Sequence, residues 1–355
     1  MSFALHVLAR ERADGPPAAP ASVRARGDLV DSHGRTIRDL RISITDRCNF
    51  RCVYCMSPDV QFRPADELLT RDEIVRLAGI TASMGVTKIR LTGGEPTLRT
   101  DLVEIIEGIR RAAPVKIAMI TNGSQIDAPR LARWRGAGLD RLTFSIDSVD
   151  PARFAAVTRS RCAPESVIDA IELAIAANLT PVKVNAVLLR GVNEDDAVEL
   201  AALAHRLPIE MRFIEYMPLD SDHAWDPRVV VTAAETRAMI ERRFPLCATG
   251  TDEPSSTART YRFCHGGAGS IGFIAPVSTP FCGQCSRLRI TSDGHVRPCL
   301  FSRTEWNLRP LLRTGATDDE LRAFLVDATW TKQAGHGISS ASFMQPERTM
   351  SAIGG

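Results

Sequence analysis

Three cysteines, Cys48, Cys52 and Cys55, lie within the short run from Thr45 to Met56, with the spacing C-x3-C-x2-C. Thiolates are ligands for soft metals, and a metal centre with three protein ligands keeps one coordination position open. Because an open position can bind a small molecule, the spacing indicates a catalytic metal centre rather than a closed structural one.

A second group of three cysteines, Cys282, Cys285 and Cys299, has the spacing C-x2-C-x13-C and also lacks an obvious fourth ligand. The chain has nine cysteines, and the N-terminus shows no apolar stretch typical of a secretion signal. In such a chain we expect metal ligands or buried thiols rather than disulfides. The three remaining cysteines are expected to be buried or incidental thiols: Cys162, Cys247 and Cys264.

Zinc is the alternative metal for either group. A structural zinc site needs four ligands, and no histidine lies within or closely after Cys48 to Cys55; the nearest, His33, precedes a predicted strand. An iron–sulfur cluster suits three thiols better, because its iron atoms prefer sulfur and one iron can stay open.

The composition is that of an ordinary globular protein, with 44% hydrophobic and 24% charged residues. The 44 Lys and Arg residues nearly balance the 42 Asp and Glu residues, which argues against a general nucleic-acid-binding surface. No apolar run approaches the roughly 18 residues of a membrane-spanning helix. We therefore expect a cytoplasmic protein with no nucleic-acid or membrane partner. Residues 1–27, rich in Ala, Arg and Pro, predict a flexible tail.

Strands and helices alternate from about residue 29 to residue 214. Strands are expected at 40–44, 88–92, 115–120, 141–145, 182–188 and 210–214, and the helices between them at 70–84, 101–111, 129–137, 167–175 and 195–205. Parallel neighbours need crossover helices, so six such units predict an α/β fold with an incomplete (β/α)6 barrel of the TIM type, over residues 28–245.

The pattern changes after residue 245. Short strands are expected at 260–263, 270–275, 286–291 and 295–297, followed by a helix at 318–329. This predicts a smaller C-terminal α+β domain, residues 246–355, that carries the second cysteine group and ends in a Gly-Gly tail.

Polar residues follow the ends of the first four predicted strands. They are the first three cysteines, then Gly93-Gly94-Glu95, Thr121-Asn122-Gly123, and Ser145 with Asp147. The carboxyl ends of parallel strands form the active edge of such sheets, so these residues should converge there. Taken alone, the two glycines could equally form a tight turn.

The first cysteine group, with Tyr54 before its last cysteine and Gly93-Gly94-Glu95-Pro96 on the next strand end, resembles the radical S-adenosylmethionine superfamily. The resemblance implies a [4Fe–4S] cluster whose open iron binds S-adenosylmethionine and whose electron releases a 5′-deoxyadenosyl radical. Glycines would let backbone groups approach the cofactor, and Glu95 could position its ammonium group.

The second group, in the run Cys282 to Arg289 and then Asp293-Gly294 and Arg297 to Phe301, together with the terminal Gly354-Gly355, resembles the molybdenum cofactor biosynthesis protein A family, the GTP 3′,8-cyclases. The resemblance covers about residues 29–355. It implies a lyase that abstracts the ribose 3′ hydrogen of GTP and forms (8S)-3′,8-cyclo-7,8-dihydroguanosine 5′-triphosphate. It also implies a second [4Fe–4S] cluster whose open iron faces guanine.

The resemblance implies roles for individual residues. S-adenosylmethionine would be contacted by Tyr54, Gly93, Gly94, Glu95, Ser145 and Met217. GTP would be surrounded by Arg41, Arg90, Thr121, Lys183, Arg212, Arg287, Leu288 and Arg289, and catalysis would involve the first three cysteines, Arg287, Arg289, Gly354 and Gly355.

Elementary electrostatics supports a cationic substrate pocket, because Arg and Lys side chains neutralise a triphosphate efficiently inside a cavity. Arg287 and Arg289 share strand parity and should face the same side. The strand residues Arg90, Lys183 and Arg212 could instead point outward into surface salt bridges.

The implied partners are a reductant protein such as flavodoxin or ferredoxin, and the cyclic pyranopterin monophosphate synthase that receives the product; a homodimer remains open. Two rivals are a radical enzyme that modifies peptides, whose relatives usually carry more auxiliary cysteines, and a zinc-stabilised binding module without catalysis.

Overall fold

The computed structural model describes residues 18–250, 253–340 and 342–354. Within them, the strands form one sheet in the order β12-β11-β10-β1-β2-β3-β4-β5-β6-β9-β8-β7. The strands are β1 (Asp39–Ser43), β2 (Lys88–Thr92), β3 (Lys116–Thr121), β4 (Arg141–Ser145), β5 (Val182–Leu188), β6 (Ile209–Glu215), β7 (Leu246–Ala248), β8 (Arg259–Phe263), β9 (Ser270–Ile274), β10 (Arg287–Ile290), β11 (His295–Arg297) and β12 (Trp306–Asn307).

The centre of the sheet is parallel, from β10 through β1 to β6 and on to β9, and the strands at both ends pair antiparallel. The end strands β12 and β7 do not pair with each other, so the sheet curves without closing. The predicted α/β class and open sheet are therefore confirmed.

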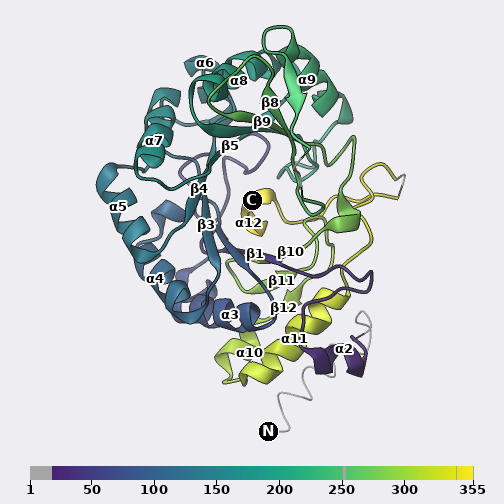
Figure 1. Cartoon of the computed structure of the whole chain (residues 1–355). Helices are drawn as coiled ribbons and strands as arrows, with labels where there is room; N and C mark the ends of the chain where they lie inside the picture. Colours follow the sequence, from purple (N-terminus) through teal and green to yellow (C-terminus); the bar gives the residue numbers. More distant parts are fainter. Residues whose placement is uncertain (1–17, 251–252, 341, 355) are drawn as a thin grey trace.

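Helices cover the outer face of the curved sheet, as Figure 1 shows. They are α3 (Arg71–Ser83), α4 (Leu102–Ala112), α5 (Ala128–Ala137), α6 (Pro151–Thr158), α7 (Pro164–Ala176), α8 (Ala197–Arg206) and α9 (Ala233–Glu241). Residues of β5 and β6 alternate between buried and half-buried, because one face packs on helices and the other faces the interior of the curve. The predicted capping box at α3 is present: the Glu73 amide donates to Thr70 Oγ1, and the Thr70 amide donates to the Glu73 carboxylate.

The C-terminal region does not build a sheet of its own, in contrast to the separate smaller domain expected from the sequence. β10 pairs with β1, and β9 pairs with β6, so strands from this region extend both edges of the central sheet. The open backbone edges of β1 and β6 explain the arrangement, because unpaired strand edges are covered where the chain can reach them. The region also contributes α10 (Arg309–Arg313), α11 (Asp318–Trp330) and α12 (Met350–Ile353), and α12 lies inside the curve of the sheet (Figure 1).

The N-terminal segment departs from the flexible tail expected through residue 27. Residues 1–17 lie outside the described residues, but α2 (Ala21–Arg26) packs near α11. Arg24 donates to both carboxylate oxygens of Asp327 at 2.9 and 2.7 Å, and the Ala19 amide donates to the same carboxylate. Pro20 stands at the N-cap of α2, where proline does not interrupt the helical hydrogen bonds.

Cys247 and Cys264 form a disulfide, which corrects the expectation that both are free thiols. β7 and β8 are antiparallel neighbours with Leu246 opposite Phe263, and this register brings the two cysteines together. Their Cα atoms lie 5.3 Å apart, a usual separation for a disulfide. No helix in the described parts of the chain has the length and apolar character needed to cross a membrane.

Candidate active site

A cavity of about 730 Å³ lies inside the curve of the sheet. It brings together nearly all of the residues predicted to do chemistry: Cys48, Cys52, Cys55, Cys282, Cys285, Cys299, Tyr54, Gly93, Gly94, Glu95, Ser145, Met217, Arg41, Arg90, Thr121, Lys183, Arg212, Arg287 and Arg289. Leu288 is absent from this lining, because its side chain points to the opposite face of β10 and is fully buried in the hydrophobic core.

The first cysteine loop follows β1 and is held at several points. The Cys55 and Met56 amides donate to the Cys52 carbonyl, and Arg51 donates through Nη1 to the Cys48 carbonyl at 2.8 Å. The Arg51 amide also bonds to the end of α6, at the carbonyl of Thr158. The loop therefore presents its three thiols from a backbone that is fixed on two sides.

The two glycines after β2 bring the chain against this loop. A Cβ on Gly93 would lie 2.4 Å from the Thr45 carbonyl oxygen, and one on Gly94 would lie 2.4 Å from that of Arg47. The Gly94 amide donates to the Thr45 carbonyl, so the two segments pair as closely as strands. Glycine is required here for packing against the cysteine loop, in addition to the approach to a cofactor expected from the sequence.

The first three thiols form a buried group with weak acidity. Burial, with smaller contributions from nearby charges, raises the pKa of Cys48 to about 11 and that of Cys55 to about 12, and the pKa of Cys52 is also raised well above its usual value. Without a cation these thiols stay protonated, because a buried thiolate with no counter-charge is unfavourable. A cationic metal centre that replaces the protons would stabilise the thiolate form. Three soft sulfur donors without a local fourth ligand fit an iron–sulfur cluster.

The second cysteine group lies in a more electropositive setting. Arg287 donates to Cys285 Sγ through Nε at 3.4 Å and Nη2 at 3.2 Å. Although burial acts in the opposite direction, Arg287 and Lys332 lower the pKa of Cys285 to about 6. Burial raises the pKa of Cys282. At least one thiol of this group is thus ready to bind metal as a thiolate.

Among the residues that the structure describes, no three His, Cys, Asp or Glu side chains converge on a point where one metal ion would sit. A [4Fe–4S] cluster does not need such convergence, because each cysteine binds a different iron. Both cysteine groups remain compatible with clusters on the chemistry of their donors.

Residues predicted to contact S-adenosylmethionine lie around the first group. Glu95 is fully buried; it accepts hydrogen bonds from the Asn122 amide at 2.7 Å, from Thr121 Oγ1 at 2.8 Å and from Thr97. Tyr54 donates its hydroxyl to Asp147 at 2.7 Å. Burial raises the pKa of Asp147 to about 6, opposed by the hydrogen bonds from the Val187 amide and Tyr54. Asp147 was predicted from the sequence to lie at the carboxyl end of a strand, but it was assigned no contact with cofactor or substrate.

A band of charged residues lines the part of the cavity farthest along the strands from the first cysteine group. Arg90 and Lys88 both pair with Asp39, at 3.1 and 2.8 Å. Lys183 and Arg212 both pair with Glu210, at 2.8 and 2.5 Å. The predicted cations therefore point inward, and the outward alternative is wrong for these residues.

Four further residues of this band were not predicted as site residues: Lys88, Arg141, and the carboxylates Asp39 and Glu210 that pair with the cations. Arg141 begins β4, and burial, Arg90 and Arg212 lower its pKa. Arg41 Nε is buried without a hydrogen-bond partner. An excess of cations over carboxylates in a confined space favours a polyanionic ligand.

The C-terminal end of the chain enters the same space. Arg289 donates through Nη1 to the Gly354 carbonyl at 2.6 Å. A Cβ on Gly354 would lie 2.7 Å from Thr92 Oγ1 and 2.8 Å from Ser43 Cβ, at the carboxyl ends of β2 and β1. Gly354 has a φ of +87°, which also favours glycine. Gly355 lies outside the described residues.

Comparison with known proteins gives two family matches. Residues 42–204 match the Radical SAM superfamily, and residues 209–338 match the Molybdenum Cofactor Synthesis C family. The second match begins at β6, so it includes the parallel strands β6, β9 and β10 as well as the antiparallel strands at both ends of the sheet.

Relatives are similar over nearly the whole chain. A protein of Streptomyces coelicolor named GTP 3′,8-cyclase is 44% identical over 330 residues, covering 92% of this chain and 96% of that protein. A GTP 3′,8-cyclase of Mycolicibacterium smegmatis is 43% identical over 361 residues, covering 100% and 99%. Among solved structures, SuiB of Streptococcus suis bound to S-adenosylmethionine aligns with a TM-score of 0.58 at 14% identity, over 84% of this chain and 68% of that one, and supports the fold alone. The chain therefore belongs to the GTP 3′,8-cyclase family of the radical S-adenosylmethionine superfamily.

Proposed function

We propose that this chain converts GTP to (8S)-3′,8-cyclo-7,8-dihydroguanosine 5′-triphosphate, the first step of molybdenum cofactor biosynthesis. One observation carries the proposal: both cysteine groups and the band of cations line a single cavity. A reaction that needs a radical source, a purine and a triphosphate held together requires these three features in one enclosed space.

Cys48, Cys52 and Cys55 hold the first [4Fe–4S] cluster in this proposal. When bound, that cluster and S-adenosylmethionine supply the 5′-deoxyadenosyl radical that removes the ribose 3′ hydrogen. Gly93, Gly94, Ser145 and Met217 provide the cofactor's contacts, since all four line the cavity. Glu95 has both carboxylate oxygens engaged by Thr121 and Asn122, so it fixes the wall of the cofactor site as well as facing it.

The second cluster is assigned to Cys282, Cys285 and Cys299. The Arg287 guanidinium beside Cys285 and the Lys332 ammonium beside the Arg287 carbonyl favour thiolate ligands, which supports this assignment. The three ligands leave an open position that the guanine base of GTP would occupy.

The triphosphate is assigned to the band of cations at the amino-terminal ends of the strands. Arg41, Arg90, Lys183 and Arg212 were expected there, and Lys88 and Arg141 complete the band. Asp39 and Glu210 hold four of these cations in place before substrate binds, so that less side-chain entropy is lost on binding. The ribose then lies between this band and the first cysteine group.

Arg289 and Gly354 close the proposed site. The hydrogen bond between them places the C-terminal turn against the ends of β1 and β2, where it excludes water from the space between the cysteine groups. Product would pass to cyclic pyranopterin monophosphate synthase, and a reductant such as flavodoxin or ferredoxin would supply the electron. A homodimer is compatible with these assignments.

The direct test is anaerobic incubation of the reconstituted protein with S-adenosylmethionine, dithionite and GTP. We expect 5′-deoxyadenosine and the cyclised nucleotide to form together, and both to fall when GTP is omitted. Formation of 5′-deoxyadenosine without any dependence on GTP would instead support an enzyme that modifies another substrate, such as a peptide. A colourless protein with zinc in place of iron would contradict every cluster assignment.

A further inference from the structure

The C-terminal turn reaches the cavity on a long connection that has few regular elements. After α11 ends at Trp330, the described residues 331–340 and 342–349 form no regular helix or strand before α12, which begins at Met350. Ile353 is almost fully buried and Met350 lines the cavity, so the last turn is packed inside the molecule. The contacts just before this turn determine the direction from which the chain enters it.

Arg348 makes the charged contacts nearest to α12. Earlier in the segment, Gln345 Nε2 donates to the Asp220 carbonyl at 2.8 Å and to its carboxylate at 3.2 Å. The Nη1 and Nη2 of Arg348 each donate to the Asp293 carboxylate at 3.0 Å, and its Nε lies 2.8 Å from Glu305 Oε2. Planar two-point contacts of this kind fix the direction of an arginine as well as its position. Only Thr349 separates Arg348 from α12, so this direction helps to set where α12 begins.

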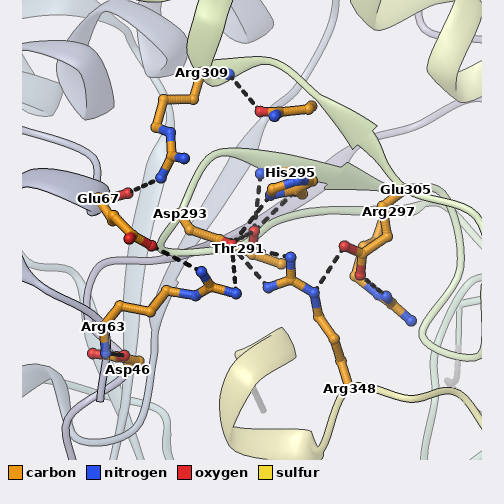
Figure 2. A network of polar contacts seen from close by, with 11 residues as sticks. Asp46, Arg63, Glu67, Thr291, Asp293, His295, Arg297, Glu305, Arg309 and Arg348 are labelled. Atoms are coloured by element: carbon orange, nitrogen blue, oxygen red, sulfur yellow. Dashed lines mark hydrogen bonds and ion pairs between the residues drawn. The ribbon is translucent and has the colours of Figure 1, made fainter. Parts of the chain in front are cut away.

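Asp293 also receives contacts from another part of the chain. It occupies the tight turn between β10 and β11 and is almost fully buried. Arg63 lies 3.2 Å from its carboxylate on one side and Arg348 on the other, as Figure 2 shows, and Thr291 Oγ1 donates to it at 2.5 Å. His295 Nδ1 lies 3.2 Å from the same carboxylate. Burial raises the pKa of Asp293, but the contacts from His295, Arg348 and Thr291 outweigh it and hold the pKa far below its usual value.

Arg63 belongs to the segment that returns from the first cysteine loop. Its amide donates to the Asp46 carboxylate at 2.7 Å, and Asp46 stands two residues before Cys48. The carboxylate of Asp293 is thus a common partner of the cysteine loop and of the C-terminal segment. It is also connected along β10 to Arg289, which binds the far end of that segment.

We propose that Asp293 is a positioning residue, a shared anchor that fixes the C-terminal turn and the returning segment of the cysteine loop in one geometry. The proposal rests on the function given above, in which Arg289 and Gly354 close the active site. Removing the carboxylate loosens both segments, although Glu305 still contacts Arg348 and Glu67 still contacts Arg63. Removing either arginine loosens only its own segment. Asp293 touches neither the cysteines nor the cations of the cavity, so its effect on turnover is transmitted through Arg348 and Arg63.

Hydrogen–deuterium exchange of the full-length protein separates these effects. In Asp293→Asn, we expect peptides covering 56–64 and 345–354 to exchange faster by roughly tenfold or more, the scale of a lost charged hydrogen bond. Arg348→Gln should accelerate only 345–354, and Arg63→Gln only 56–64. GTP turnover by the reconstituted enzyme should fall by about tenfold in Asp293→Asn and Arg348→Gln, while iron content stays at the wild-type level.

Arg24 and Asp327 provide a matched control, since they form an equally close two-point pair that joins α2 to α11 outside the cavity. Asp327→Asn should leave the exchange of both segments and GTP turnover unchanged. If Asp293→Asn disturbs the β10–β11 turn itself, the peptide covering 289–297 will exchange faster. Arg348→Gln then tests whether the Asp293–Arg348 contact holds the C-terminal segment, because Arg348 lies outside that turn.

Unchanged exchange of 345–354 in Arg348→Gln would overturn the proposal, as would equal losses in the Asp293 and Asp327 variants. The exchange measurement does not depend on activity. If the wild-type protein fails to convert GTP but the exchange pattern holds, the anchor stands and the proposed reaction falls.

Discussion

Arg289 and Gly354, 65 residues apart in the sequence, are joined by a hydrogen bond of 2.6 Å inside the cavity. The guanidinium that donates it stands among other cations, and burial together with Arg287 and Arg297 lowers its pKa to about 9. A backbone carbonyl is a neutral acceptor, so it satisfies the arginine without cancelling its charge. Arg289 therefore keeps its positive charge available to an anionic substrate while it holds the end of the chain.

Substituting the cysteines should separate the two clusters. Cys48→Ala should lose about four irons per chain and all 5′-deoxyadenosine formation, because the first cluster cannot assemble. Cys285→Ala should also lose about four irons but keep cofactor cleavage without forming cyclised product. Cys162→Ala, at a half-buried thiol outside the cavity lining, is the control and should match the wild type. Iron analysis with product chromatography measures all three, and full iron content in Cys285→Ala would contradict the second assignment.

Gly94→Ala should displace the first cysteine loop. The new Cβ would lie 2.4 Å from the Arg47 carbonyl oxygen, a backbone atom that cannot move away cheaply. We expect the free energy of unfolding to fall by about 1–3 kcal/mol and cluster content to drop. Gly136→Ala, on α5 with no atom near the new Cβ, should instead be neutral or slightly stabilising. Urea unfolding of both apo variants tests this, and equal behaviour would refute the packing argument.

GTP binding should weaken as the pH rises above 8. Burial and Arg212 lower the pKa of Lys183 to about 8, and a bound triphosphate would raise it again. Below pH 8 the lysine is already protonated, so binding takes up no proton through it. Above pH 8 binding must protonate it, and the Kd should rise by up to about tenfold per pH unit.

Lys183→Arg should lose this pH dependence, because arginine stays charged throughout the range. Lys116→Arg, at an exposed position at the start of β3, should retain it. Calorimetry in two buffers of different ionisation enthalpy measures the proton uptake directly. If the Kd for GTP rises with pH equally in wild type and Lys183→Arg, another group is responsible for the titration.

Arg141→Gln should raise the KM for GTP by about tenfold, the effect expected for one charged hydrogen bond to phosphate. The same substitution should weaken the binding of guanosine monophosphate, measured as a competitor, by a smaller factor, because the monophosphate lacks the outer phosphates. Arg135→Gln, which removes a surface arginine of α5 bonded to the Ala177 carbonyl, is the matched control. Equal losses for the triphosphate and the monophosphate would place Arg141 away from the phosphate chain.

The disulfide between Cys247 and Cys264 is tested by counting thiols. Alkylation of the denatured apoprotein should label seven cysteines before reduction and all nine after it. Replacing both by serine should lower the free energy of unfolding by about 3 kcal/mol, the scale for a loop of this length. Labelling of nine thiols without a reductant would contradict the pairing.

The convergence of the strand-end residues could be predicted because the alternation of strands and helices dictates a parallel sheet, and such a sheet gathers its carboxyl ends at one edge. Cys48, Gly94, Thr121 and Ser145 lie together for that reason. Arg141 was not predicted, because it begins its strand and the convergence rule concerns the carboxyl ends of strands. A search of inward-facing strand positions for cations would have found it.

Three features that depend on contacts between distant parts of the chain could not be predicted from local sequence patterns. α2 has six residues and is held by Arg24 bonding to Asp327 across the chain, which no pattern in residues 21–26 indicates. The Cys247–Cys264 pairing depends on β7, a three-residue strand too short to recognise from alternation. The joining of β10 to β1 likewise depends on which edges remain free, which is a property of the assembled sheet.

The pairing of β1 with β10 also bears on the order in which this protein can mature. Asp39 pairs with Arg287, so the sheet stays incomplete during synthesis until most of the chain has left the ribosome. The turn at Ile353 and Gly354 that contacts β1 and β2 follows β10 in the chain, so it emerges later still. The first three cysteines therefore leave the ribosome well before the turn that covers this side of the cavity, and until then the side stays open.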